Sequence, residues 1–189
     1  MSQSQSTTHG LVNGELGVMV ADRRTLDQLF SVTYEELRRL AATIRRDDPA
    51  ASLSPTALVN EAWLKLASSP PFVMTSRVHF KRIAARAMRQ VLVEAARRRT
   101  ARKRGDGVAP VTFEDGMAAE PSGPEELLAL DQALEALAKI SPRQATMVES
   151  RFFGGLDVAE TAELLGVSEA TILRDWRAAK AWLAQELRA

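Results

Sequence analysis

Apolar residues in this chain recur every three or four positions through most of its length, which is the pattern of amphipathic helices. The single tyrosine and the scarcity of β-branched runs argue against a sheet. The sequence therefore predicts an all-α fold. The predicted helices span residues 23–46 (with an interruption near 31–33), 54–67, 78–102, 125–139, 141–153, 157–165 and 168–183.

Two segments lack this periodicity. Residues 1–21 are rich in Ser, Gln, Thr and Gly, which is typical of a disordered tail. Residues 105–124 carry Gly, Pro and acidic residues, which is typical of a flexible linker. The sequence thus predicts two small helical domains, over residues 22–104 and 125–189.

The last two predicted helices are separated by a very short corner. Asp157 is placed to cap the first of them, and Gly166 can adopt the positive φ that ends it. Ser168 is placed to cap the second helix two residues later. This spacing fits a helix-turn-helix, in which the second helix enters the major groove of DNA. A plain helical hairpin would show a similar pattern, but the short Gly-Val-Ser corner favours the DNA-binding form.

The second helix of this hairpin has an apolar back and a largely basic front. Its apolar positions are Ile172, Trp176, Ala179 and Leu183. Its outward positions are Glu169, Arg174, Arg177 and Lys180.

The net charge of +1 conceals a strong segregation of charge along the chain. Residues 77–104 contain eleven Lys and Arg and a single acid, Glu94, whereas residues 105–138 contain no Lys or Arg. A block of this kind can neutralise nucleic-acid phosphates. The alternative is a solvated helix face. A solvated face is less consistent with a block in which nearly all the charges are positive.

The chain offers little for catalysis. It has no cysteine, and its two histidines, His9 and His79, are far apart and lack a metal-ligand pattern. It has no Gly-rich phosphate loop and no nucleophile elbow. We therefore expect no enzyme activity, no cofactor and no metal. The sequence has no secretory signal and no apolar run long enough to span a membrane, so we expect a cytoplasmic protein without a membrane partner.

Three motifs resemble those of a known family. They are the segment Pro55–Leu66, the segment His79–Ala84 running into Ala95–Arg99, and Arg151-Phe-Phe-Gly-Gly-Leu156 followed by the hairpin. With them the chain resembles bacterial sigma factors of the extracytoplasmic-function (ECF) group of the sigma-70 family, over about residues 22–187. The resemblance implies a protein that binds core RNA polymerase and promoter DNA and directs transcription initiation.

The resemblance also implies a role for each segment. The contacts expected with core polymerase are Leu58, Asn60, Glu61, Trp63 and Lys65, although core packing alone would also explain Trp63. The contacts expected with the −10 region are Phe72, His79, Arg82, Arg86, Arg89, Arg97, Arg98 and Arg99, whereas Phe80 is expected in the core. The contacts expected with the −35 region are Ser168, Thr171, Arg174, Arg177 and Lys180.

One segment departs from the ECF pattern. Many members carry acidic residues before and within the polymerase-docking helix, but here residues 51–60 contain none. We hypothesise that phosphorylation of Thr56, or of Ser54 or Ser52, supplies the missing negative charge. The alternative is that Ser54 only caps the helix and Thr56 only lies in its first turn. An anti-sigma factor or a Ser/Thr kinase is accordingly an expected partner.

Other functions remain open on the sequence alone. A free-standing helix-turn-helix regulator that acts without polymerase would share the C-terminal hairpin, but its first domain usually receives a signal. A structural or RNA-binding helical protein is a third, weaker alternative. The basic helix in the first domain favours the sigma factor.

Overall fold

The computed structural model describes residues 19–20, 23–44, 53–69, 73–74, 76–102 and 123–188. The described residues confirm the prediction of an all-α fold, with one two-stranded ladder besides the helices. The helices are α1 (Arg23–Ile44), α2 (Pro55–Ala67), α3 (Arg77–Arg102), α4 (Pro124–Ile140), α5 (Pro142–Gly154), α6 (Val158–Leu165) and α7 (Glu169–Glu186). The strands are β1 (Met19–Val20) and β2 (Val73–Met74).

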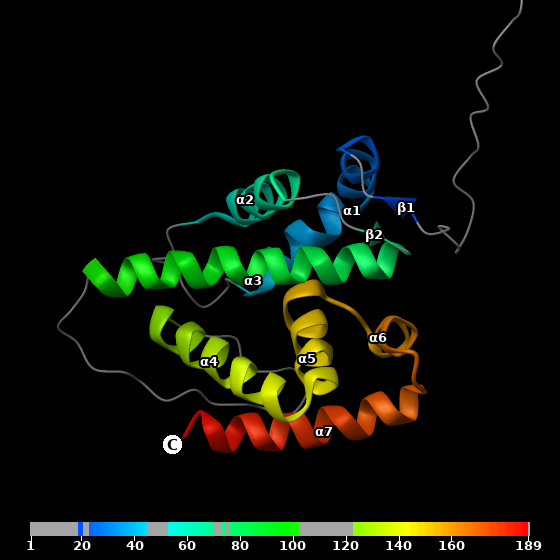
Figure 1. Ribbon diagram of the computed structural model, residues 1–189. Helices are drawn as coiled ribbons and strands as arrows, with labels where there is room; N and C mark the ends of the chain where they lie inside the picture. Colours follow the sequence, from blue (N-terminus) through cyan, green and yellow to red (C-terminus); the bar gives the residue numbers. More distant parts are fainter. Residues whose placement is uncertain are drawn as a thin grey trace, which may run out of the picture.

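Helix α3 runs through the middle of the molecule (Figure 1). Helices α1 and α2 lie on one side of it, and α4 and α5 lie on the other. Phe80 and Met88 of α3 are fully buried and belong to one hydrophobic cluster with Leu58 of α2, Leu134 of α4 and Phe153 of α5. The long basic helix is therefore also the element that joins the two halves of the chain.

Two sequence-based expectations are wrong. Helix α1 is continuous through residues 31–33, because the buried Thr33 hydroxyl donates a hydrogen bond to the carbonyl oxygen of Leu29 at 2.7 Å instead of breaking the helix. Met19 and Val20, assigned to the disordered tail, form strand β1 and pair antiparallel with Met74 and Val73. The rest of the predicted tail and nearly all of the predicted linker lie outside the described residues.

The predicted corner of the C-terminal hairpin is confirmed in its backbone geometry. The Asp157 carboxylate accepts the backbone N–H of Glu160, whose side chain in turn accepts the N–H of Asp157, forming a capping box. Gly166 has φ 62°, a left-handed value that favours glycine. Ser168 accepts the backbone N–H of Thr171 and so caps α7. Local sequence alone therefore fixes where α6 ends and α7 begins.

Candidate nucleic-acid interface

Helix α7 exposes a basic face to solvent. Its apolar side is buried through Ile172, Ala179 and Leu183, each at most 3% exposed. On the opposite side, the Arg174 side chain is 71% exposed and Arg177 is also exposed. These arginines can reach a ligand without any rearrangement of the helix.

An ion pair between an exposed arginine and a buried aspartate links α7 to α5. The Asp175 carboxylate is 7% exposed and accepts hydrogen bonds from Arg143, at 3.1 Å from Nε and 2.7 Å from Nη2. Nearby, the Arg151 guanidinium lies 4.3 Å from the ring centroid of Trp176, a cation–π contact. Sequence analysis missed Asp175, although its place between Ile172 and Ala179 on the apolar side was a usable sign. These contacts hold the exposed face of α7 at a fixed angle.

The exposed face of α7 also carries an apolar side chain that sequence analysis missed. Leu173 is 45% exposed and adjoins Arg174. At the start of the helix, the hydroxyls of Ser168 and Thr171 are 3.0 Å apart and take part in the cap. The face therefore combines basic, hydroxyl and apolar groups, which is the mixture that reads base edges in a major groove.

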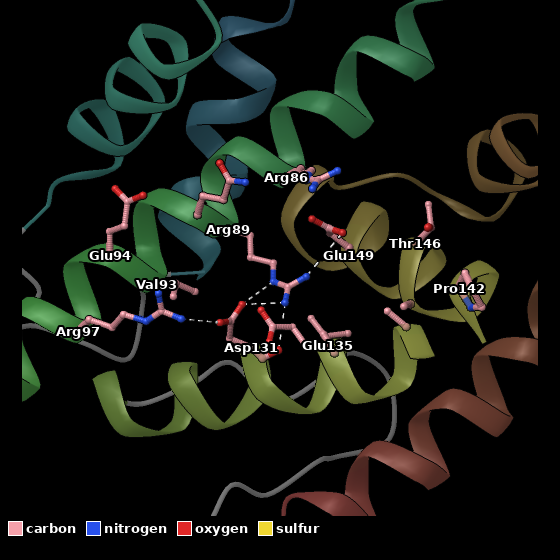
Figure 2. Close-up of a pocket in the computed structure, with 14 residues that line it drawn as sticks. Arg86, Arg89, Val93, Glu94, Arg97, Asp131, Glu135, Pro142, Thr146 and Glu149 are labelled. Carbon is pink, nitrogen blue, oxygen red and sulfur yellow. Dashed lines mark hydrogen bonds and ion pairs between the residues drawn. The ribbon is translucent and has the colours of Figure 1, made fainter. Parts of the chain in front are cut away.

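The arginines of α3 have a different environment. The Arg89 guanidinium is 15% exposed and donates to Asp131 of α4, at 2.9 Å to the carboxylate and 3.0 Å to the backbone oxygen. Arg97 approaches the other oxygen of the same carboxylate at 3.5 Å. Figure 2 shows Asp131 between these two arginines. Two residues predicted to bind −10 DNA thus contact an acid from the C-terminal half of the chain.

A cleft of about 390 Å³ lies beside these pairs, between α3, α4 and α5. Glu149 of α5 lines it, with one carboxylate oxygen 3.7 Å from Arg89. Burial raises the pKa of the Glu149 carboxyl above its usual value, although the charges of Arg89, Arg86 and Arg82 oppose this. Arg82, Arg86 and Arg89 are hereafter called the arginine row of α3. Arg86 and Arg89 line the cleft together with Glu149, and Arg86 is exposed.

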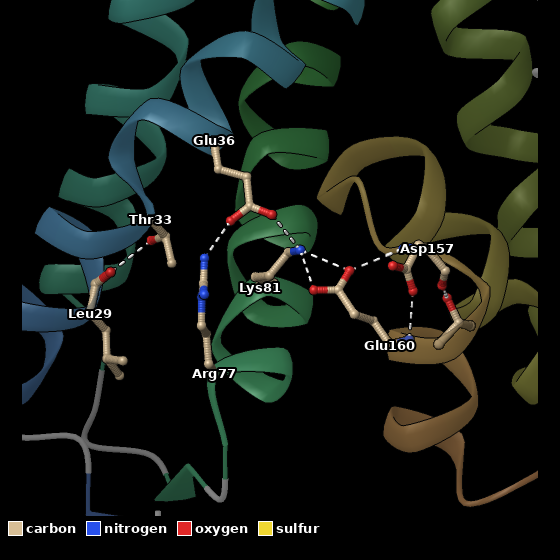
Figure 3. Close-up of polar contacts among 8 residues, drawn as sticks. Leu29, Thr33, Glu36, Arg77, Lys81, Asp157 and Glu160 are labelled. Carbon is tan, nitrogen blue, oxygen red and sulfur yellow. Dashed lines mark hydrogen bonds and ion pairs between the residues drawn. The ribbon is translucent and has the colours of Figure 1, made fainter. Parts of the chain in front are cut away.

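A buried lysine makes a second link between the two halves. Lys81 of α3 is 1% exposed, and its Nζ lies 2.7 Å from Glu36 of α1 and 2.7 Å from Glu160 of α6 (Figure 3). Burial alone would raise the pKa of Glu36, but the hydrogen bonds and charges of Lys81 and Arg77 lower it below its usual value. Because Glu160 also closes the α6 capping box, Lys81 ties that cap to the N-terminal half.

A family model described as ECF sigma factor matches residues 17–189. The chain belongs to the ECF sigma factor family. No curated protein and no solved structure was found to match it. Membership in this family gives the sigma factor a role in transcription initiation, with DNA binding as part of that role.

In this sigma factor, helix α2 shows which predicted polymerase contacts are accessible. Asn60 and Glu61 are exposed, as is Leu64 at 58%, a residue that sequence analysis missed. Leu58 is fully buried, so it supports α2 from beneath, and its prediction as a direct contact is corrected. Trp63 stacks on Phe30 of α1 with ring centroids 4.7 Å apart, which supports the packing alternative.

The remaining predicted contacts of the sigma factor are dispersed. Lys65 pairs with Glu94 of α3, and Arg98 is exposed on α3. His79 is half-buried, and burial together with the Arg82 charge lowers its pKa. Phe72 lies outside the described residues. The expectation that Phe80 belongs to the core is confirmed.

The described part of the sigma factor carries neither a metal-binding cluster nor a membrane-spanning helix. In it, no group of three or more His, Asp or Glu side chains is arranged to hold a metal ion. None of its helices has the length and apolar character that crossing a bilayer requires.

Proposed function

We propose that this ECF sigma factor binds core RNA polymerase through the outer face of α2 and directs it to promoters whose −35 element is read by α7. The observation that carries this proposal is the exposed basic face of α7, held by the Arg143–Asp175 pair on a helix of a protein that belongs to the ECF family. A merely structural hairpin has no need of such a face.

On α7, Arg174 and Arg177 supply the donors for guanine edges, because an arginine can bind the O6 and N7 atoms of guanine together. Leu173 supplies an apolar contact for a thymine methyl group. Ser168, Thr171 and Lys180 lie on the same helix or at its start and contribute phosphate or base contacts. Together these residues determine which promoters are chosen.

On α3, the arginine row together with Arg97, Arg98 and Arg99 binds the phosphates of the −10 region. His79 and Phe72, near the start of α3, receive a base that has left the stack. The captured bases and neutralised phosphates offset the stacking energy lost on opening the duplex. Strand opening in this scheme requires no catalytic residue.

On α2, Asn60, Glu61 and Leu64 form the accessible contact with polymerase. Thr56 lies exposed in the first turn of a helix that has no acidic residue in that turn. A phosphate there adds a charge of about −1.5 to −2 beside the positive end of the helix dipole. We expect a Ser/Thr kinase to strengthen docking in this way, and Thr56→Glu to bind core polymerase more tightly than Thr56→Ala in a pull-down. Equal binding by wild type and both variants would remove this role of Thr56.

Transcription from promoter DNA by purified core polymerase tests the proposed function. We expect initiation above core polymerase alone with wild type, and loss of initiation with Glu61→Arg, which reverses a charge on the proposed docking face. Gln28→Arg is the matched control, since Gln28 is exposed on α1. DNA binding without any stimulation of initiation would favour a regulator that acts without polymerase.

A further inference from the structure

The three proposed contact surfaces differ in accessibility. The outer faces of α2 and α7 are open, and so is Arg86 in the arginine row of α3. Arg89 of the same row is only 15% exposed and lies against α4 and α5. The residues that cover Arg89 come from the C-terminal half of the same chain.

Charge complementarity provides part of the attachment. The carboxylate of Asp131 meets Arg89 and Arg97, and the carboxylate of Glu149 lies 3.7 Å from Arg89. In the proposed function, these guanidinium groups bind phosphate oxygens. Carboxylate oxygens offer arginine the same charge and hydrogen-bonding geometry as phosphate oxygens do. The cover and a nucleic-acid strand thus compete for the same donors.

A glycine provides the second part of the attachment. Gly155 ends α5 with φ 64°. This left-handed backbone conformation explains why a glycine stands at position 155. Gly154 has no positive φ, but a Cβ atom added to it would lie 2.9 Å from the Cβ of Ala85 and 3.3 Å from the backbone oxygen of Lys81. The absence of a side chain at Gly154 is what allows the end of α5 to lie directly on α3.

The chain between the two halves is long enough to let the cover leave. Twenty residues, 103–122, connect α3 to the segment before α4. A chain of that length can span up to about 70 Å when extended. Separation of α4 and α5 from α3 is thus compatible with the covalent connection.

We propose that residues 124–154 act as an intramolecular cover that competes with single-stranded promoter DNA for Arg89 of α3. The inference rests on the proposed strand-binding role of the arginine row. In the covered state the outer faces of α2 and α7 and the side chain of Arg86 stay accessible, so polymerase docking and −35 recognition precede exposure of Arg89. A strand that binds only the uncovered state shifts the equilibrium toward it.

Binding of a fluorescein-labelled oligothymidylate strand to the free full-length protein, followed by anisotropy, tests this cover. Asp131→Asn removes the central carboxylate charge with little change in shape, and we expect it to tighten binding by about tenfold. Glu135→Gln is the matched control, because Glu135 is exposed and lines the same cleft one turn further along α4. The control should bind like wild type.

Gly154→Ala provides an independent way to lift the cover, through steric contact with Ala85 instead of through charge. We expect it also to tighten oligothymidylate binding, and Gly154→Ala combined with Ala85→Gly to return binding toward the wild-type value. Far-UV circular dichroism checks that each variant is folded. Binding by folded Asp131→Asn and Gly154→Ala that equals the wild-type value would overturn the cover. Initiation by wild type in the transcription assay would then show that the proposed function survives without it, whereas absent initiation would show that the function itself fails.

Discussion

The arginines of α3 and those of α7 recur at similar helical spacings, yet Arg89 of α3 and Arg174 of α7 have opposite surroundings. On α7 the apolar back is buried and Arg174 extends into solvent, 71% exposed. On α3, Arg89 is only 15% exposed and is bonded to Asp131. The difference shows that the spacing of basic residues along a helix does not predict which of them are accessible in the free protein.

The physical cause of the difference is the place of each helix in the core. Helix α7 packs at one side of the molecule and needs to bury a single face. Helix α3 is central and packs against helices on two sides, so part of its basic surface lies beneath a neighbour (Figure 1). Guanidinium groups there require acidic partners, because an unpaired buried charge is costly.

The largest expected effect comes from replacing one arginine of each helix by methionine. Arg89→Met leaves the buried Asp131 carboxylate without its closest partner, and we expect a loss of about 3 kcal/mol in the free energy of unfolding. Arg177→Met removes an exposed charge, and we expect a change within about 0.5 kcal/mol. Urea unfolding of both variants measures this contrast. Equal losses of unfolding free energy in the two variants would mean that Arg89 is no more important to the packed structure than the exposed Arg177.

The next effect concerns promoter choice at the open helix. Arg174→Ala removes a base contact proposed for α7, and we expect discrimination between matched and mismatched −35 duplexes to fall by roughly 1–3 kcal/mol. Binding to both duplexes is measured by titration at fixed salt concentration. Arg188→Ala, an exposed arginine beyond the end of α7, is the control. Unchanged discrimination by Arg174→Ala would remove that residue from base recognition.

The smallest effect is a pH dependence at Glu149 of α5, where α5 faces Arg89. The folded state holds the proton of Glu149 more tightly than the unfolded chain does, because burial raises the pKa of this carboxyl above its usual value. The contribution of Glu149 to stability is therefore full below its unfolded pKa and is lost as the pH rises through its folded pKa.

Glu149→Gln removes that loss. We expect its advantage in unfolding free energy over wild type to be larger at pH 7 than near pH 4. The exposed Glu135→Gln should show no such trend. An advantage of Glu149→Gln that stays constant with pH would show that the carboxyl is not destabilised by burial.

Features that depend on neighbouring residues were predictable from the sequence. Asp157, Gly166 and Ser168 form the predicted caps because each acts within three or four residues of its own position. The interruption expected in α1 was wrong because Thr33 satisfies its hydroxyl within the helix. The residue type alone does not show whether a threonine interrupts a helix or satisfies its hydroxyl within one.

Features that depend on distant contacts were not predictable. Asp131 was one acid among several in a segment without basic residues, and its partner Arg89 lies 42 residues earlier in the chain. The pairing of Met19–Val20 with Val73–Met74 likewise joins segments far apart in sequence. Leu58 illustrates a third case, in which the helix itself was predicted but the side chain faces the core. A single sequence therefore shows which residues form a helix surface more readily than it shows which other part of the chain packs against that surface.

Transcription by a sigma factor with its cover locked is the most direct test of the account. The chain has no cysteine, so Ala85→Cys with Gly154→Cys introduces one pair at the contact between α3 and α5. A disulfide needs Cβ atoms about 3.5–4.5 Å apart, so a pair that starts at 2.9 Å requires α5 to move away from α3 by roughly 1 Å while the bond keeps the two helices together. We predict that the oxidised protein supports no initiation with core polymerase, that reduction restores it, and that wild type initiates under both conditions. Equal initiation by the oxidised and reduced forms would contradict the account.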